Sequence, residues 1–290
     1  MRLVFLGTPE AAVPTLEAVL DAGHEVVLVV TRPDRRRGRG SQLSPSPVKE
    51  AALRHGLAVT HRLADVADVD AQRGIVVAYG AIISESLLHK LPMLNVHFSL
   101  LPRWRGAAPV QRAVLAGDLE TGVSIISLEV SLDTGPVHLE RRIPVGDDSA
   151  EELTGRLAVL GASALVEVLA TPALLDHPTP QSGETTYAEK LSAETFRLHP
   201  AMSSDLAWRT VRLGHAYFSF GPKRIGVVEA RPTHVAPSPG ELFQENGEIV
   251  LGVSDGGVVM TSVRPEGGKT MDARSWWSGL RPAQERRTWS

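Results

Sequence analysis

Short apolar runs alternate with amphipathic stretches through the N-terminal part of the chain. Residues 3–6 and 25–30 predict buried strands, and the apolar positions between them predict a helix over 11–22 that ends at Gly23. This order of elements is typical of a βαβ unit. The same patterns predict strands at 57–60, 74–78 and 94–97 and helices at 47–55 and 109–116. The expected fold is α/β, with a doubly wound and mostly parallel sheet.

The stretch 94–99 alternates apolar and polar residues, which is the pattern of a strand with two different faces. Asn95 and His97 then project from the same face, roughly 7 Å apart along the strand. Pro102 ends the strand because it cannot donate to a ladder hydrogen bond, and Gly106 allows a tight turn. Ligands of open α/β sheets bind at the carboxyl ends of the strands, so this amide and this imidazole are candidate site residues.

The pattern changes toward the C-terminus. Strands predicted at 123–128 and 137–143 flank a turn at 131–136, and a long amphipathic helix is expected over 151–169. Residues 171–186 are rich in Pro and Thr and read as a linker. After a helix at 205–213, short alternating runs predict a small, OB-like β-barrel, with strands at 225–230, 241–244, 248–252 and 258–263. We expect a catalytic domain at 1–176, a linker at 177–195 and the barrel at 196–290.

The composition is that of a soluble globular protein, with 43% hydrophobic and 22% charged residues among 290. The absence of Cys excludes disulfides, thiol nucleophiles and Cys-ligated zinc. The apolar runs at 3–6 and 26–30 are too short for a signal-peptide core or a membrane span. We therefore expect a cytoplasmic protein that does not contact a membrane.

Charge is unevenly distributed along the chain. Residues 196–290 hold 12 Lys and Arg against 9 Asp and Glu, a net charge of +3, whereas the rest holds 18 against 24, a net charge of −6. The segment 31–47 adds five Arg with several Gly and Pro, which predicts an exposed loop. These basic regions fit contact with phosphates, because the guanidinium fork matches phosphate oxygens. Ordinary solvated surface explains them equally well.

Asn95, His97 and Asp133 could together catalyse acyl transfer to an amine. An imidazolium and an amide can donate to the oxyanion of such a reaction, and a neighbouring carboxylate can orient the imidazole and accept a proton. In the simpler interpretation, Asn95 and His97 bind loop backbone and Asp133 forms an Asx turn. A zinc site with His138 fits no familiar ligand spacing. Residues 7–10, Gly-Thr-Pro-Glu, give little support for dinucleotide binding because they lack G-x-G-x-x-G.

Several motifs together resemble the folate-dependent formyltransferases. They are FLGTPE at 5–10, RPDRRRGRG from 32, VVAYG at 76–80, NVHFSLLPRWRGAAPVQRAVLAGD at 95–118, TGVSIISLEVSLDTG at 121–135 and TYAEKLS at 186–192. The chain departs from the family by being shorter near 63–74 and 91–94, by a different segment at 214–224 and by Phe98, where many relatives have Gly.

The resemblance implies a Rossmann-like fold, a catalytic trio of Asn95, His97 and Asp133, and no metal. It implies transfer of a formyl group from 10-formyltetrahydrofolate to the α-amino group of initiator methionyl-tRNA, releasing tetrahydrofolate, by a monomeric enzyme. The expected folate contacts are Ala78, Tyr79, Gly80, Ser99, Leu100, Leu101, Pro102 and Leu128. The expected tRNA contacts are Arg35, Arg36, Arg37, Arg39 and Lys49, together with the C-terminal barrel.

Two other functions fit the same residues. A sister formyltransferase that acts on an amino sugar nucleotide or on glycinamide ribonucleotide would use the same trio without needing the Arg-rich loop. An RNA-binding protein on an inactive enzyme fold would bind tRNA without turnover, and the intact trio speaks against it.

Overall fold

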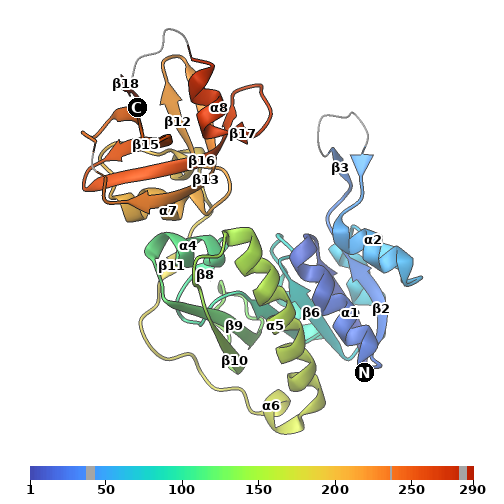
Figure 1. The fold of residues 1–290 in the computed structure, drawn as a ribbon. Coiled ribbons are helices and arrows are strands. Elements are labelled where there is room, and N and C mark those ends of the chain that lie inside the picture. The colour runs from blue at the N-terminus through green and yellow to red at the C-terminus, as the bar shows by residue number, and fades with distance from the viewer. Residues whose placement is uncertain (37–42, 236, 281–285) are drawn as a thin grey trace. The chain divides into compact units, whose positions relative to one another are not determined.

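The computed structural model describes residues 1–36, 43–235, 237–280 and 286–290. The chain forms two compact units (Figure 1). The N-terminal unit comprises Met1–Val110, Leu119–Gly146 and Glu152–Lys190. The C-terminal unit comprises Gln111–Asp118, Asp147–Glu151 and Leu191–Ser290. Arg37 and Arg39 lie outside the described residues.

A seven-stranded sheet forms the centre of the N-terminal unit, in the order β10-β9-β7-β6-β1-β2-β5. The neighbouring strands β7, β6, β1, β2 and β5 run parallel. Strand β9 is antiparallel to β7, and β10 is antiparallel to β9. The prediction of a mostly parallel sheet is therefore confirmed. Its strands are β1 Arg2–Gly7, β2 Glu25–Val30, β5 Val59–Thr60, β6 Arg73–Val77, β7 Met93–His97, β9 Glu120–Ser127 and β10 Val137–Pro144.

Helices cover this sheet because its central strands β1, β2 and β6 are mostly apolar and buried on both faces. Val4 and Leu6 of β1 pack in one cluster with Val66 and Leu87, which lie on the short helices η2 and α3. The helices of this unit are η1 Glu10–Ala12, α1 Val13–Asp21, α2 Pro47–Arg54, η2 Leu63–Asp68, α3 Glu85–Lys90, α4 Pro109–Ala116, α5 Ala150–Ala170 and α6 Pro172–Asp176. Residues 111–116 of α4 and 150–151 of α5 are grouped with the C-terminal unit.

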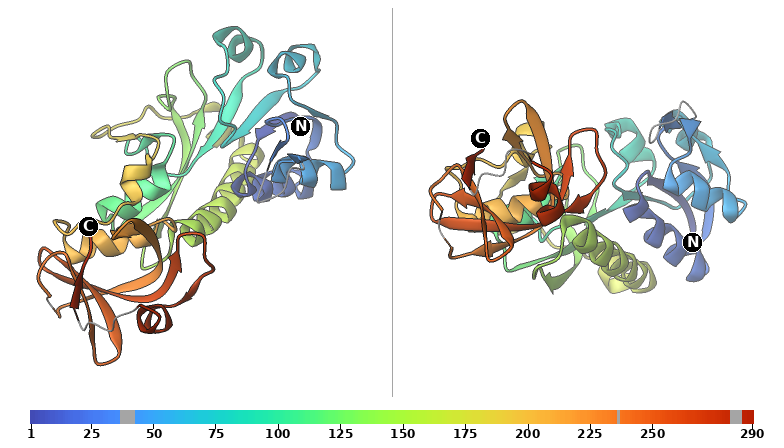
Figure 2. Two further views of the ribbon diagram at one scale, coloured as in Figure 1. Left: turned by 90° about the horizontal axis from the view of Figure 1, so that it is seen from above. Right: turned by 45° about the horizontal axis from the view of Figure 1, so that its top comes forward.

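Helix α5 runs along the sheet, as the views in Figure 2 show. Its Gly161 lies against Val96, Phe98 and Val123, and a Cβ at this position would overlap Val96. Among the described helices, α5 alone is long and apolar enough to cross a membrane, and half of its most apolar window is buried inside the protein. Such burial is typical of a core helix in a soluble protein.

The connections reverse direction at the middle of the sheet. From β1 the chain proceeds to β2 on one side, whereas from β6 it proceeds to β7 on the other. The boundary between β1 and β6 is thus a topological switch point, with a crevice outside the carboxyl ends of its strands. Gly7, Val77 and His97 end the three strands that meet there.

The C-terminal unit is a nearly closed antiparallel barrel, as predicted. Its strand order is β12-β13-β16-β15-β14-β18, and β17 also pairs with β16. Ser290 exchanges two backbone hydrogen bonds with Ser219 of β12, at 2.6 and 3.0 Å, which links the last segment to the first strand. The elements are η3 Ala193–Phe196, α7 Ser204–Val211, β12 Tyr217–Phe220, β13 Lys223–Thr233, β14 Glu241–Glu245, β15 Glu248–Val253, β16 Gly256–Pro265, β17 Met271–Asp272, α8 Ala273–Ser278 and β18 Arg286–Thr288.

The barrel core is aromatic at its centre. Phe218 is fully buried and meets Trp276 and Trp289 edge to face, at centroid distances of 6.1 and 5.7 Å. Such pairs add about 1 kcal/mol each beyond the area they bury. The sequence pattern did not predict β12, which carries Phe218, α8, which carries Trp276, or β18, which Trp289 follows.

The segment expected to be an irregular linker also contains structure. Helix α6 follows α5 directly, and β11 (Tyr187–Ala188) pairs in parallel with β8 (Arg105–Gly106). A Cβ on Gly106 would overlap the carbonyl oxygen of Ala188, so glycine permits this close approach. The short strands β3 (Arg35–Arg36) and β4 (Leu43–Ser44) form an antiparallel pair in the Arg-rich segment.

Candidate active site

Asn95, His97 and Asp133 line one cavity of about 760 Å³ at the carboxyl end of β7. The cavity is open to solvent, yet the three residues are only 9%, 6% and 9% exposed. No hydrogen bond among the described residues involves the side chain of Asn95, so its amide is available to a ligand. The structure therefore brings together all three predicted catalytic residues.

His97 is fixed by contacts on both ring nitrogens. Its Nε2 donates to the carbonyl oxygen of Trp104 at 2.9 Å, because a carbonyl can only accept. Its Nδ1 lies 3.7 Å from Oδ2 of Asp133, which is within ion-pair range but beyond a hydrogen bond. The same Oδ2 accepts a hydrogen bond from the backbone N–H of Gly106 at 2.8 Å. No Asx turn is described at Asp133, whose bond reaches a distant segment, whereas His97 does bind loop backbone as the simpler interpretation expects.

Three residues around the cavity have left-handed backbone conformations that side chains rarely adopt. The φ angles are 45° for Ala78, 63° for Trp104 and 51° for Asp133. Such conformations cost on the order of 1 kcal/mol each, less for Asp, and they concentrate at functional sites. At Trp104 this conformation accompanies the hydrogen bond that its carbonyl accepts from His97.

Two residues of the expected linker support the trio, which no pattern in the sequence predicts. Gln181 Nε2 donates to the backbone oxygens of Asp133 at 2.8 Å and Gly135 at 2.9 Å. Its Oε1 accepts two hydrogen bonds from the Arg105 guanidinium, at 3.1 and 2.6 Å. Thr186 Oγ1 accepts from the backbone N–H of Trp104 at 2.9 Å. Side-chain contacts between distant segments have no sequence period that could predict them.

The predicted folate residues divide into two groups. Ala78, Tyr79, Gly80 and Leu128 line the cavity. Ser99, Leu100, Leu101 and Pro102 are absent from its described lining, because the chain turns away after β7. Ser99 Oγ instead donates to the carbonyl of Arg103 at 2.6 Å, and the N–H of Leu101 donates to Ser124 Oγ at 3.1 Å. Leu100 packs close to Gly122 of β9.

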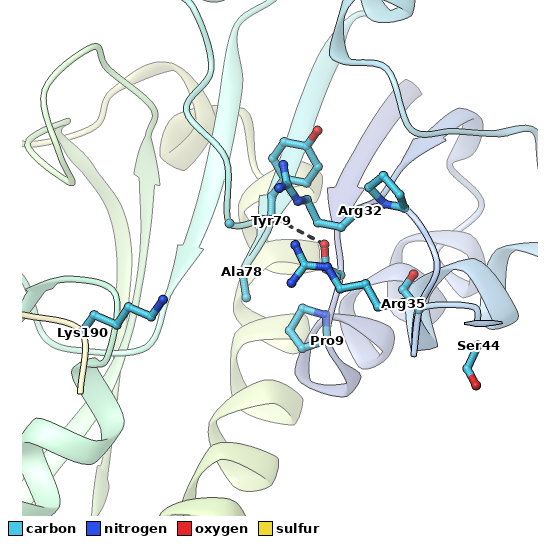
Figure 3. A pocket seen from close by; sticks show the side chains of 11 residues that line it. Pro9, Arg32, Arg35, Ser44, Ala78, Tyr79 and Lys190 are labelled. Carbon is cyan, nitrogen blue, oxygen red and sulfur yellow. Dashed lines mark hydrogen bonds between the residues drawn. The ribbon is translucent and has the colours of Figure 1, made fainter. Parts of the chain in front are cut away.

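A second cavity of about 430 Å³ lies beside the first and shares Ala78, Tyr79 and Gly80 with it (Figure 3). Its remaining lining includes the cations Arg32, Arg35 and Lys190. Burial raises the pKa of the Tyr79 phenol, and the positive charge of Arg32 opposes this shift. The phenol therefore stays protonated near neutral pH and can donate a hydrogen bond.

The predicted tRNA residues are not equally available in the described part of the chain. Arg35 lines the second cavity, and Arg36 is exposed on β3. The ammonium of Lys49 is bound by both carboxylate oxygens of Asp34, at 2.9 and 2.8 Å. A phosphate would have to compete with Asp34 for Lys49.

The zinc alternative is wrong. His138 Nδ1 donates to the carbonyl of Leu174 at 2.9 Å, and its Nε2 bonds Ser127 Oγ at 2.9 Å. Both nitrogens are therefore engaged away from His97 and Asp133. Among the described residues, no group of three or more His, Asp or Glu side chains could hold a metal ion.

A buried amide, an imidazole and a carboxylate at the crevice of a doubly wound sheet suit transfer of an acyl group. Residues 1–169 match the formyl transferase family, and residues 204–281 match the formyl transferase C-terminal domain. The chain belongs to the formyl transferase family.

Several relatives that match nearly the whole chain are methionyl-tRNA formyltransferases. That of Heliobacterium modesticaldum is 42% identical over 308 aligned residues, covering 97% of this chain and 98% of its own. That of Thiobacillus denitrificans is 40% identical, covering 96% of each chain. The solved methionyl-tRNA formyltransferase of Clostridium thermocellum shares the fold with a TM-score of 0.57 at 13% identity, covering 94% of this chain and all of its own.

Proposed function

We propose that this protein transfers the formyl group of 10-formyltetrahydrofolate to the α-amino group of initiator methionyl-tRNA, for translation initiation. The observation that carries the proposal is the cavity in which Asn95, His97 and Asp133 converge. Relatives about 40% identical to this chain over nearly their full length are methionyl-tRNA formyltransferases, which supports the proposal.

The cavity fits the formyl donor in size and in chemistry. Its volume of about 760 Å³ lies within the usual range of small-molecule sites. Apolar side chains suited to a flat ring line part of it, including Val96, Phe98 and Leu128. Ile82, Val130 and Leu132 also line it and are 93%, 63% and 61% exposed. When bound there, 10-formyltetrahydrofolate would supply an activated formyl carbon. Ala78, Tyr79, Gly80 and Leu128 would hold it.

Three groups of the chain then act on the reacting atoms. The amine nitrogen bonds to the formyl carbon, the bond from that carbon to the folate nitrogen breaks, and one proton passes from the amine to the folate nitrogen. The Asn95 amide and a protonated His97 donate to the formyl oxygen as negative charge develops on it. Asp133 accepts the amine proton, directly or through water, and returns it. No covalent enzyme intermediate and no metal are needed.

His97 can fulfil this role only with its present neighbours. Because the Trp104 carbonyl takes the Nε2–H, the proton facing Asp133 resides on Nδ1 in the charged imidazole. The gap of 3.7 Å is longer than a hydrogen bond, so this N–H is left to donate to a substrate oxygen while the carboxylate balances the charge.

The basic segments of the chain support methionyl-tRNA as the acceptor of the formyl group. Arg35 and Arg36 on β3 would meet the acceptor end of the tRNA together with Arg37 and Arg39, and Lys49 would join after release from Asp34. The C-terminal barrel would add further contacts to the RNA through its net charge of +3. We propose that the enzyme acts as a cytoplasmic monomer with domains at 1–176 and 196–290. Light scattering would test the monomer, and limited proteolysis near 177–195 would test the domain bounds.

Formylation of charged initiator methionyl-tRNA with 10-formyltetrahydrofolate tests the function. We expect turnover with the wild type and losses of about 100- to 1,000-fold in kcat for His97→Ala and Asn95→Ala. His89→Gln is a matched control, because His89 is an exposed imidazole on α3 whose partner among the described residues is Glu85. Near-normal turnover by folded His97→Ala would contradict the mechanism. Formylation of small amines but not of methionyl-tRNA would favour a sister activity.

A further inference from the structure

The second cavity gathers cations that have no anion among the described residues. Arg32, Arg35 and Lys190 line it, and the side chain of none of the three makes a hydrogen bond or ion pair with any described residue. No carboxylate belongs to the described lining. The nearby carboxylate of Asp34 is already bound to Lys49. Cations placed together without counter-charge repel one another, so the cavity favours an anionic ligand.

Its place in the fold also indicates a ligand site. Thr8 and Pro9 follow β1, Arg32 follows β2, and Ala78 follows β6, so the cavity lies at the switch point of the sheet. In the view of Figure 3 the side chains of Arg35 and Lys190 point toward Ala78 from opposite sides. The hydroxyl of Thr8 donates to the carbonyl of Tyr79 at 3.2 Å, which joins the two strand ends.

The wall shared with the catalytic cavity identifies the anion. Ala78, Tyr79 and Gly80 line both the cavity of the three cations and the cavity of Asn95 and His97. In an aminoacylated RNA, the phosphate nearest the reacting amine is separated from it only by the amino-acid ester and one ribose. The positive charge continues from Arg35 to exposed Arg36 on β3, which suits a chain of phosphates leading away from the site.

We propose that this second cavity binds the phosphodiester that joins the terminal, aminoacylated nucleoside of the acceptor RNA to the nucleotide before it. Arg32 and Arg35 bind its oxygens through their guanidinium forks, and Lys190 contributes a point charge. The contact fixes the ribose and thereby holds the α-amino group in front of His97 and Asp133. This inference rests on the proposed function and adds a positioning subsite to it.

Two minimal acceptors isolate the phosphodiester. Methionyl-adenosine has none, whereas methionyl-cytidylyl-adenosine has the one next to the terminal nucleoside. We expect the wild type to prefer the dinucleotide ester. Arg32→Gln and Lys190→Gln should each lower kcat/KM for the dinucleotide ester by about tenfold and leave methionyl-adenosine unchanged, because a charged hydrogen bond to phosphate is lost. Unchanged turnover of methionyl-adenosine shows at the same time that the variant is folded.

A control and a second readout sharpen the test. Arg54→Gln removes an equal charge from α2, where Arg54 is exposed beside Glu17, and should leave both acceptors unaffected. With charged tRNA, Lys190→Gln should reduce the slope of log KM against log salt concentration by about one. An unchanged slope would overturn the assignment.

Other results would overturn either the proposed subsite or the proposed function. Equal losses with both esters would overturn the subsite, as would equal use of both by the wild type. A loss that appears with 10-formyltetrahydrofolate but not with the donor lacking its glutamate tail would assign the cavity to the folate carboxylates instead. Failure of the wild type to formylate charged methionyl-tRNA would overturn the proposed function itself, whereas the other results would leave it standing.

Discussion

Gln181 is the residue whose replacement should most clearly separate positioning from catalysis. Its side chain makes four hydrogen bonds, two to the backbone oxygens of Asp133 and Gly135 and two from the Arg105 guanidinium. Gln181→Met keeps the approximate volume and removes all four. It thereby frees the turn that carries Asp133 without touching a reacting atom.

The magnitude follows from the kind of bond lost. The two neutral bonds are worth about 1 kcal/mol each, and those from the guanidinium about 1.5–3 kcal/mol. Gln181 is half-buried, so water can replace part of this, and we expect a loss of about 2 kcal/mol in the free energy of unfolding. A shift of Asp133 by about 1 Å would lower kcat by up to about 100-fold.

The assay measures kcat and KM for charged methionyl-tRNA alongside urea unfolding. We expect kcat to fall with little change in KM. Gln181→Glu should regain stability, because an oxygen can still accept from Arg105, yet keep a low kcat, because no N–H remains for Asp133 and Gly135. Gln72→Met is the matched control, since Gln72 Oε1 accepts from the backbone of Arg2. A normal kcat in Gln181→Met with reduced stability would refute the positioning role.

Three further predictions concern stability. Burial lowers the pKa of His138, the hydrogen bond to Leu174 raises it and Arg73 lowers it further. The unfolded chain therefore binds the proton more readily, and the free energy of unfolding should fall as pH drops below about 6.5. Thermal melts at a series of pH values would show this fall, and His138→Gln should make it smaller. Gly135→Ala should destabilise by about 3 kcal/mol in urea titrations, because its Cβ would overlap the carbonyl oxygen of Ser127. Ser46→Ala should cost about 1–2 kcal/mol, because Ser46 Oγ caps α2 through the Lys49 N–H and bonds Thr31; an unchanged midpoint would contradict this.

Local patterns predicted the elements wherever one residue's neighbours in sequence are also its neighbours in space. The strand at 25–30 was predicted with the bounds of β2, and the helix at 47–55 was predicted with the first residue of α2. The polar pair Asn95 and His97 was placed on one side of β7 by the period of a strand alone. Short elements such as α3 and β12 were missed because their apolar pattern is too brief to show a period.

Contacts between distant segments lay beyond such reasoning. The order of strands places the Asp133 turn beside the end of β7, and pairing of β8 with β11 brings Gln181 and Thr186 to the same place. The bond from His97 to Trp104 depends on a left-handed φ at Trp104, which local preference disfavours. Lys49 was expected to face phosphate, and the tertiary structure pairs it with Asp34.

The α/β and barrel architecture, the polar pair on β7 and the family motifs are all readable from the chain, because apolar period and residue chemistry act locally. Three arrangements follow from the complete fold: Asp133 lies 3.7 Å from His97, residues 99–102 turn away from the cavity, and Arg32, Arg35 and Lys190 line a second one. They depend on how strands are ordered and loops are held by hydrogen bonds across the fold. Such distances are fixed only when the whole sheet and its loops pack together.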